Sequence, residues 1–144
     1  LIYSRPDLTG REYPMNAKST LNAAAVAGFS AVALGAFGAH GLKGVLDDAI
    51  MTVYHTAVLY HLVHSAVLLA LAVWLKVMPG NRWLSWSANL MLVGMILFCG
   101  SLYAMTLTGI RPLGIITPFG GVSWLAGWAL LLVAASKLKT QDSE

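Results

Sequence analysis

Four long stretches of this sequence carry almost no charge, and they restrict the fold more than any other feature. Crossing the hydrocarbon core of a bilayer, about 30 Å thick, requires roughly 20 mostly apolar residues in a helix. Stretches of that length lie near 20–39, 55–77, 84–107 and 119–137. Only 10% of the 144 residues are charged, whereas ordinary soluble domains carry about 25%. We therefore predict an all-α membrane protein with four transmembrane helices.

The chain divides into a short polar segment and one apolar domain. Residues 1–14 hold four charged side chains and two prolines. We expect this segment to be a non-native or disordered extension and Met15 to be the native start. Residues 15–144 then form a single four-helix transmembrane domain.

Residues 42–53, between the first two spans, show helical spacing of their apolar side chains. These side chains are Leu42, Val45, Leu46, Ala49, Ile50 and Val53. We predict a short amphipathic helix lying on the membrane surface. The alternative is a simple loop in solvent.

Lysines and arginines are distributed unequally between the two sides of the membrane. One side has Lys18, Lys76, Arg82, Lys137 and Lys139, and the other has Lys43 and Arg111. Because cytoplasmic flanks carry the excess of basic residues, we predict that both termini are cytoplasmic. We expect Trp83, Trp86 and Tyr103, near the ends of the third span, and Trp124, near the start of the fourth, to lie in the aromatic belt at the membrane surface.

Small residues recur on one face of the first and fourth spans. The first face consists of Ala24, Gly28, Ala31, Gly35 and Gly38, and the second of Gly120, Ser123, Gly127 and Ala134, interrupted by Leu130. Helices in lipid associate by close backbone approach through such residues. We predict that both faces are packing faces, either within one bundle or between protomers.

All four histidines lie at or beside the first hairpin. Together with a tyrosine and a serine they form a candidate polar strip: His40, Tyr54, His55, His61, His64 and Ser65. Polar residues inside a span face the bundle interior and are functional candidates. Three interpretations remain open: hydrogen bonds that hold helices together, a metal or cofactor site, and a path for protons or a solute.

A metal site would need more ligands than the spacing supplies. Zinc binds three or four ligands in tetrahedral array, and His40, His55 and Asp47 or Asp48 meet only if the connecting segment folds back. Haem at the histidines would need two of them to face each other. We therefore predict no cofactor, with a metal or haem at the histidines as the open alternative. The single Cys99 excludes an intramolecular disulfide.

The connection between the third and fourth spans, residues 106–117, is apolar for an exposed loop, so we expect it to lie in the membrane interface. Its one charged residue, Arg111, is a candidate ligand for a lipid headgroup. The alternatives are an ion pair with Asp47 or Asp48 and an arginine that extends to water without a partner.

Several short motifs resemble one known family. They are Ala-Leu-Gly-Ala-Phe-Gly-Ala-His-Gly-Leu at 33–42, Tyr-His-Leu-Val-His at 60–64, Gly-Ser-Leu-Tyr at 100–103, Thr-Pro-Phe-Gly-Gly-Val-Ser at 117–123 and Ala-Gly-Trp-Ala-Leu at 126–130. In order and spacing they resemble the YgdD family of small bacterial inner-membrane proteins over about residues 20–138. The resemblance implies a four-span protein of the inner membrane whose biochemical function is not established, so no catalytic residues are carried over.

Three classes of function remain. The first is an accessory or packing subunit of a homo-oligomer or of a larger complex of integral membrane proteins. The second is a small transporter or channel subunit that uses the polar strip. The third, a membrane enzyme or cofactor carrier, lacks any catalytic constellation in the sequence. The basic residues are scattered singly, so we expect contact with the lipid bilayer and none with nucleic acid.

Overall fold

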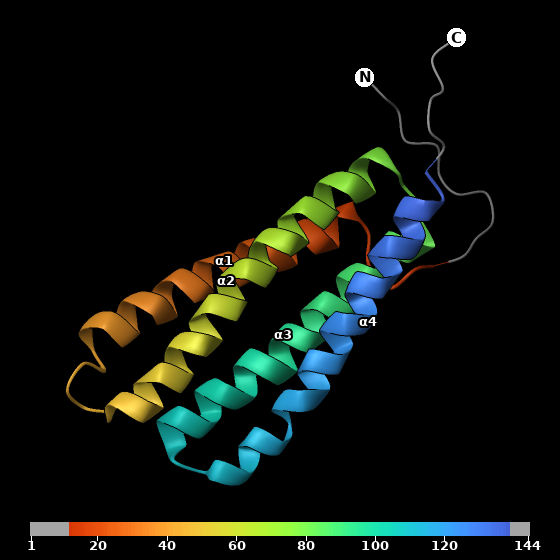
Figure 1. The fold of residues 1–144 in the computed structure, drawn as a ribbon. Helices are drawn as coiled ribbons and strands as arrows, with labels where there is room; N and C mark the ends of the chain where they lie inside the picture. The colour runs from red at the N-terminus through yellow and green to blue at the C-terminus, as the bar shows by residue number, and fades with distance from the viewer. Residues whose placement is uncertain (1–11, 139–144) are drawn as a thin grey trace.

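The computed structural model describes residues 12–138, and within this range it contains helices and no strand. The helices are α1 (Ala17–His40), α2 (Asp48–Val77), α3 (Arg82–Thr108), the short 3-10 helix η1 (Arg111–Ile115) and α4 (Thr117–Ser136) (Figure 1). Four of these segments are long and apolar enough to cross a membrane, the last counted from Arg111. The prediction of four spanning helices in an all-α chain is confirmed. Most of the segment predicted as an extension, residues 1–11, lies outside the described range, as does Lys139.

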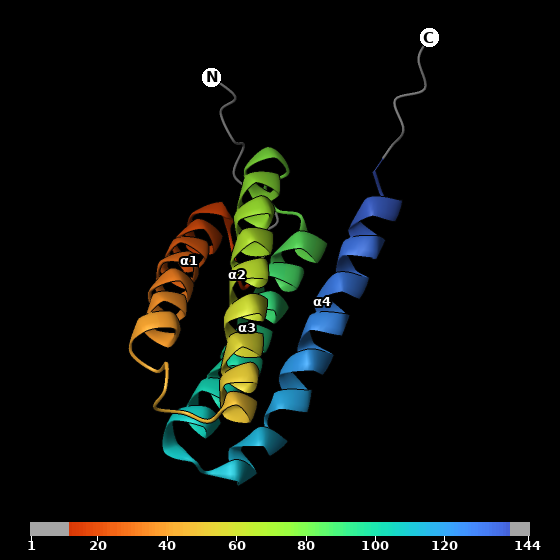
Figure 2. The ribbon, with the colours of Figure 1, turned by 60° about the vertical axis from the view of Figure 1, so that its left-hand side comes forward.

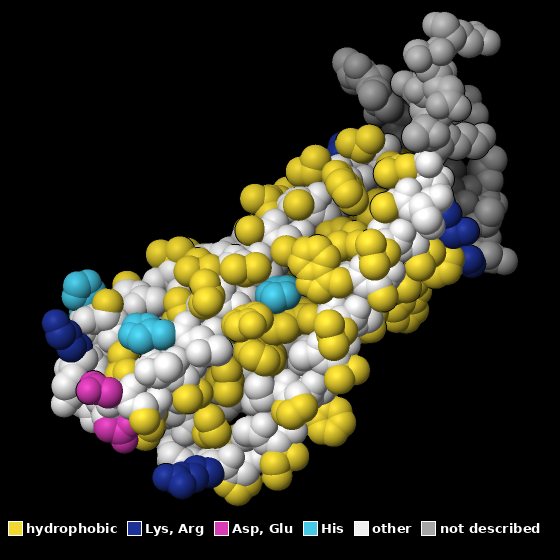
Figure 3. All heavy atoms as spheres, viewed as in Figure 1, with side chains coloured by type: hydrophobic (Ala, Val, Ile, Leu, Met, Phe, Trp, Pro, Cys, Tyr) yellow, Lys and Arg dark blue, Asp and Glu magenta, His cyan; other side chains and the backbone are white. Residues whose placement is uncertain are grey.

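Each helix packs mainly against the helices next to it in the chain. Helix α1 lies against α2, α2 against α3, and α3 against α4. Figure 2 shows α1 and α4 on opposite sides of the central pair. The two outer helices therefore keep broad exposed faces, and hydrophobic side chains cover the flank of the molecule between its charged ends (Figure 3).

Short polar side chains begin three of the four long helices. Asn16, Asp47 and Asn81 each accept hydrogen bonds from backbone N–H groups of the first turn. These bonds satisfy donors that have no partner within the helix. At the other end of α3, Gly109 has φ 74°, a left-handed conformation that glycine adopts without strain.

The separate surface helix predicted over 42–53 is not supported. Residues 41–46 form turns, with Gly44 at φ 77°, and α2 begins at Asp48. Asp47 caps α2, so Ala49, Ile50 and Val53 belong to its first turns. Their apolar spacing continues without a break into the long helix, which explains why the pattern in the sequence looked helical.

The small residues of α1 face α2. Ala24, Ala31 and Gly38 are buried, whereas Gly28 and Gly35 are half-buried. Gly38 lies under the ring of Tyr54, where a Cβ atom would come 2.5 Å from Cε1. Gly35 would place a Cβ 3.3 Å from Val58. Glycine at these positions is what allows the two helices to approach.

The small residues of α4 face α3. Gly120, Gly127 and Ala134 are buried, and Ser123 and Leu130 are half-buried. A Cβ at Gly120 would overlap the backbone of Phe98 and come 2.8 Å from the carbonyl oxygen of Gly94. The Ser123 hydroxyl donates to the Leu90 carbonyl at 2.8 Å. The two helices thus meet backbone to backbone.

Candidate functional site

His61 is the centre of a polar contact among three helices. It lies on α2 and is 7% exposed. Its Nε2 shares a hydrogen bond of 3.3 Å with the Ser30 hydroxyl on α1, and its Nδ1 shares one of 3.2 Å with the Tyr103 hydroxyl on α3. The imidazole therefore has one hydroxyl partner on each side.

Tyr54 lies two turns before His61 on the same face of α2 and is fully buried. Its hydroxyl donates to the Leu34 carbonyl on α1 at 2.7 Å. Its ring meets the edge of Tyr103, with centroids 5.3 Å apart. Tyr54 and His61 therefore both join α2 to α1 and to α3, one above the other.

His64 belongs to a second, aromatic layer. Its Nδ1 donates to the Tyr60 carbonyl at 2.9 Å, because a carbonyl can only accept. Its ring lies flat on the indole of Trp124 from α4. Ser65, also buried, donates its hydroxyl to the His61 carbonyl at 2.6 Å. The predicted strip thus continues inward to Ser65.

The outer part of the predicted strip does not join this cluster. His40, the last residue of α1, and His55, in the second turn of α2, are both exposed. Among the residues that the structure describes, no three His, Cys, Asp or Glu side chains lie close enough to hold a metal ion. Cys99 is buried in the hydrophobic core. Arg111 is exposed at the start of η1.

Three residues of the cluster were missed or misplaced by the sequence analysis. Ser30 was not singled out, since one serine in an apolar span carries little signal. Tyr103 and Trp124 are expected in the aromatic belt from their positions near span ends, whereas the structure shows both contacting other helices inside the bundle. Tyr103 bonds to His61, and Trp124 is 5% exposed and donates its indole N–H to the Met91 carbonyl at 3.0 Å. Gly94, opposite Trp124, leaves the space that the indole occupies.

The chemistry available to the cluster is hydrogen bonding and proton exchange. Within residues 12–138, no buried side-chain nitrogen or oxygen lacks a hydrogen-bond partner. The carboxylates of Glu12, Asp47 and Asp48 form no hydrogen bond with His61 or Tyr103. Among residues 12–138, His61 therefore contacts the Ser30 hydroxyl without a carboxylate that would orient its imidazole, as the aspartate of a Ser–His–Asp triad does.

Four apolar helices joined by buried polar contacts define a polytopic helical membrane protein. The family model described as "Protein of unknown function (DUF423)" matches residues 34–121. The chain belongs to this family.

Curated relatives cover most of the chain. "UPF0382 membrane protein YwdK" of Bacillus subtilis (strain 168) is 44% identical over 107 residues, which are 74% of this chain and 87% of the relative. "UPF0382 inner membrane protein YgdD" of Escherichia coli (strain K12) is 42% identical over 125 residues, which are 87% and 95% of the two chains. No solved structure matches. The resemblance to the YgdD family is thereby confirmed, and the family has no established function.

Proposed function

We propose that this protein is a packing subunit of the bacterial inner membrane that assembles with copies of itself through the outer face of α3. The relative from Escherichia coli is named an inner membrane protein. In this proposal His61, Tyr54 and His64 hold the bundle together, and the small residues of α1 and α4 close it. Assembly of the oligomer therefore depends on a different surface, the outer face of α3.

One residue, Asn89, carries the proposal. It lies in α3, seven residues after the helix begins, which is about 10 Å along the axis at 1.5 Å per residue. Its side chain is half-buried, and within residues 12–138 it forms no hydrogen bond with another side chain or a backbone group. A polar side chain at membrane depth is costly without a partner.

The surroundings of Asn89 suit a second helix. The exposed residues in line with it on α3 are Trp86, Val93, Ile96 and Gly100. Ile96 is 62% exposed, and a Cβ added at Gly100 would meet nothing within 4 Å. An amide contains both a donor and an acceptor, so two Asn89 side chains can pair across a two-fold axis. The commonest symmetric oligomer, a dimer, satisfies both amides at once.

Cysteine crosslinking in native membranes tests this face directly. Val93→Cys in a Cys99→Ser background keeps Asn89 and should form a disulfide-linked dimer on mild oxidation, because Val93 is exposed one turn from Asn89 on the same face of α3. Phe29→Cys is the matched control, since it is 79% exposed on α1, away from the proposed face. Equal crosslinking at positions 29 and 93, or none at 93, would contradict the proposal.

We also propose that both termini face the cytoplasm. At one end of the molecule, Lys18 and Lys76 line one cleft, and Arg82 and Lys137 both approach the ring of Trp83. Lys43 and Arg111 belong to the connections at the other end. Both variants are made in the Cys99→Ser background and expressed in intact cells. A membrane-impermeant thiol reagent added outside the cells should label Lys43→Cys and should not label Lys76→Cys. The reverse labelling would contradict this orientation.

A second candidate function is a path for protons through the cluster. The observation that favours it is the chain of exchangeable hydrogens from Ser30 through His61 to Tyr103. In liposomes with a pH gradient, this function predicts proton flux that is lost in Tyr103→Phe while the bundle stays folded. The packing function predicts no flux in either protein.

A further inference from the structure

A cleft of about 1080 Å³ opens at the end of the bundle where α1 begins and α2 ends. Its walls come from the segment before α1, the first turn of α1, the last turns of α2 and the start of α3. This volume lies just above the range of about 300–1,000 Å³ in which proteins hold small ligands. The polar cluster around His61 contributes no residue to the cleft, so the two are separate features.

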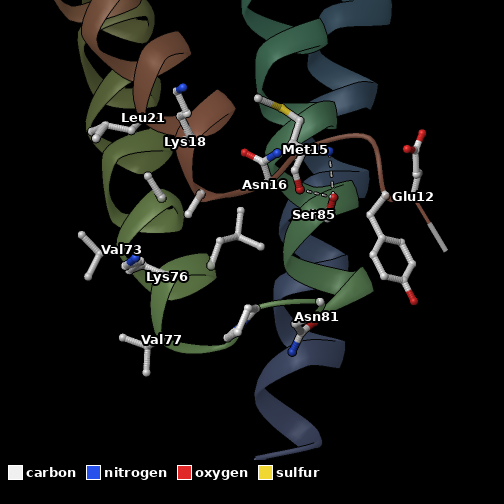
Figure 4. Close-up of a pocket in the computed structure, with 16 residues that line it drawn as sticks. Glu12, Met15, Asn16, Lys18, Leu21, Val73, Lys76, Val77, Asn81 and Ser85 are labelled. Carbon is white, nitrogen blue, oxygen red and sulfur yellow. Dashed lines mark hydrogen bonds between the residues drawn. The ribbon is translucent and has the colours of Figure 1, made fainter. Parts of the chain in front are cut away.

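The N-terminal segment forms one wall because Ser85 ties it to α3. The Met15 backbone N–H donates to the Ser85 hydroxyl at 2.9 Å, and that hydroxyl donates to the Met15 carbonyl at 2.6 Å. Figure 4 shows this pair on one side of the cleft and Lys18, Leu21 and Lys76 on the other. Met15 and Ser85 are both buried.

The cleft is cationic at its rim and apolar along its side. Lys18 lies in the first turn of α1 and Lys76 in the last turn of α2, and both are exposed. Glu12 also lines the cleft, so two ammonium groups stand against one carboxylate. Leu21, one turn after Lys18, and Val73, one turn before Lys76, supply the apolar wall. Charge on the rim and apolar surface beneath it match a phosphate group that continues into a hydrocarbon chain.

The depth of the cleft matches the polar layer of a bilayer. Its lining on α2 runs over 72–77, which corresponds to about 7 Å of helix at 1.5 Å per residue. The headgroup layer on each side of the hydrocarbon core is about 5–8 Å thick. We propose that the cleft binds an acidic phospholipid, with its phosphate at Lys18 and Lys76 and its glycerol and upper acyl chain against Leu21 and Val73.

Native mass spectrometry of the full chain tests this site. The protein is titrated with phosphatidylglycerol and with phosphatidylcholine of the same acyl chains. We expect preferential retention of phosphatidylglycerol, with affinity falling about fivefold for each lysine removed in Lys18→Gln and Lys76→Gln. Lys43→Gln, at the opposite end of the bundle, is the control and should keep the preference.

Two results would overturn the proposal. The first is a preference for phosphatidylglycerol that survives the double substitution Lys18→Gln and Lys76→Gln, or that falls equally in Lys43→Gln. The second is displacement of the lipid by inorganic phosphate at comparable concentration, because the cleft would then bind a free anion. Failure of either test leaves the proposed dimer face on α3 untouched, since Asn89 does not line the cleft.

Discussion

The imidazole of His64 lies flat against the indole of Trp124, with ring centroids 3.7 Å apart and ring planes 7° from parallel. Helix α4 packs mainly against α3. The stack adds a direct contact between α4 and α2, because Trp124 belongs to α4 and His64 to α2. Tyr60 and Phe98 extend it, with centroids 5.5 and 4.7 Å from that of Trp124. The aromatic layer thus links α2, α3 and α4, whereas the layer around His61 links α1, α2 and α3.

The first prediction concerns the indole that completes this layer. Trp124→Ala should lower the free energy of unfolding by about 3–5 kcal/mol, the usual loss for a buried large aromatic. Trp124→Phe should lose less, about 0.5–1.5 kcal/mol, because phenylalanine keeps an aromatic ring. Its loss comes from the missing N–H donor to the Met91 carbonyl. The measurement is unfolding in mixed micelles with increasing dodecyl sulfate, followed by circular dichroism. Trp128→Ala, on the exposed face of α4, is the control and should change stability by less than about 0.5 kcal/mol. An equal loss at positions 124 and 128 would refute the buried stack.

A second prediction uses two adjacent glycines. Gly120→Ala should destabilise the protein by about 1–3 kcal/mol, because its Cβ meets the backbone of α3, which cannot move aside cheaply. Gly121→Ala carries the same chemical change in the same helix, and its Cβ would meet nothing within 4 Å. We expect Gly121→Ala to be neutral or slightly stabilising, as alanine favours helix over glycine. Similar melting temperatures for the two variants would show that α3 and α4 are further apart than described.

The third prediction measures the polar contact at His61. A double-mutant cycle of His61→Leu with Tyr103→Phe should give a coupling free energy of about 0.6–2 kcal/mol, the range for hydrogen bonds between membrane helices. The cycle of His61→Leu with Ser30→Ala should give a coupling free energy of the same sign, because Ser30 also bonds to His61. Tyr60→Phe is the control, since no hydrogen bond joins its hydroxyl to His61. A coupling free energy of zero between positions 61 and 103 would show that the two side chains do not stabilise the bundle through a hydrogen bond.

A fourth prediction distinguishes two neighbouring aspartates. Asp47→Ala should cost about 0.5–2 kcal/mol, because Asp47 accepts the Ile50 backbone N–H at the start of α2. Asp47→Asn keeps an acceptor oxygen and should restore most of the loss. Asp48→Ala is expected to have the smaller effect, since Asp48 acts on the helix only through its charge. Hydrogen exchange at Ile50 and Met51 reports the effect locally. Faster exchange in Asp48→Ala than in Asp47→Ala would show that the cap was wrongly assigned.

The sequence predicts the spanning helices well, because hydropathy is a local property. It places the start of the second span near residue 55, whereas α2 begins at Asp48. The extra turns are amphipathic, and amphipathic residues next to a polar loop look the same whether they form a separate helix or extend a long one. The cap at Asp47 distinguishes the two structures, and it is visible only once the turn at 41–46 is known.

The contacts of the candidate site were less predictable from one sequence. Spacing along α2 places Tyr54, His61 and Ser65 on one face, and that face is buried. The partners Ser30, Tyr103 and Trp124 depend on how other helices are rotated, which spacing within one helix does not determine. Trp124 shows this most clearly, since its position near a span end suggested the membrane surface. Gly94, on another helix, has no side chain and leaves room for the indole inside the bundle.

The mass of the assembly at its native abundance tests the central claim most directly. The protein is extracted in a mild detergent from cells that express it from its own chromosomal copy, and native mass spectrometry gives the mass of the complex. We predict two or more copies of the chain, reduced to a single copy by Asn89→Leu and retained in Asn22→Leu, which alters an exposed asparagine on α1. A single copy in the unmodified protein, or a complex whose mass Asn89→Leu leaves unchanged, would contradict assembly through α3.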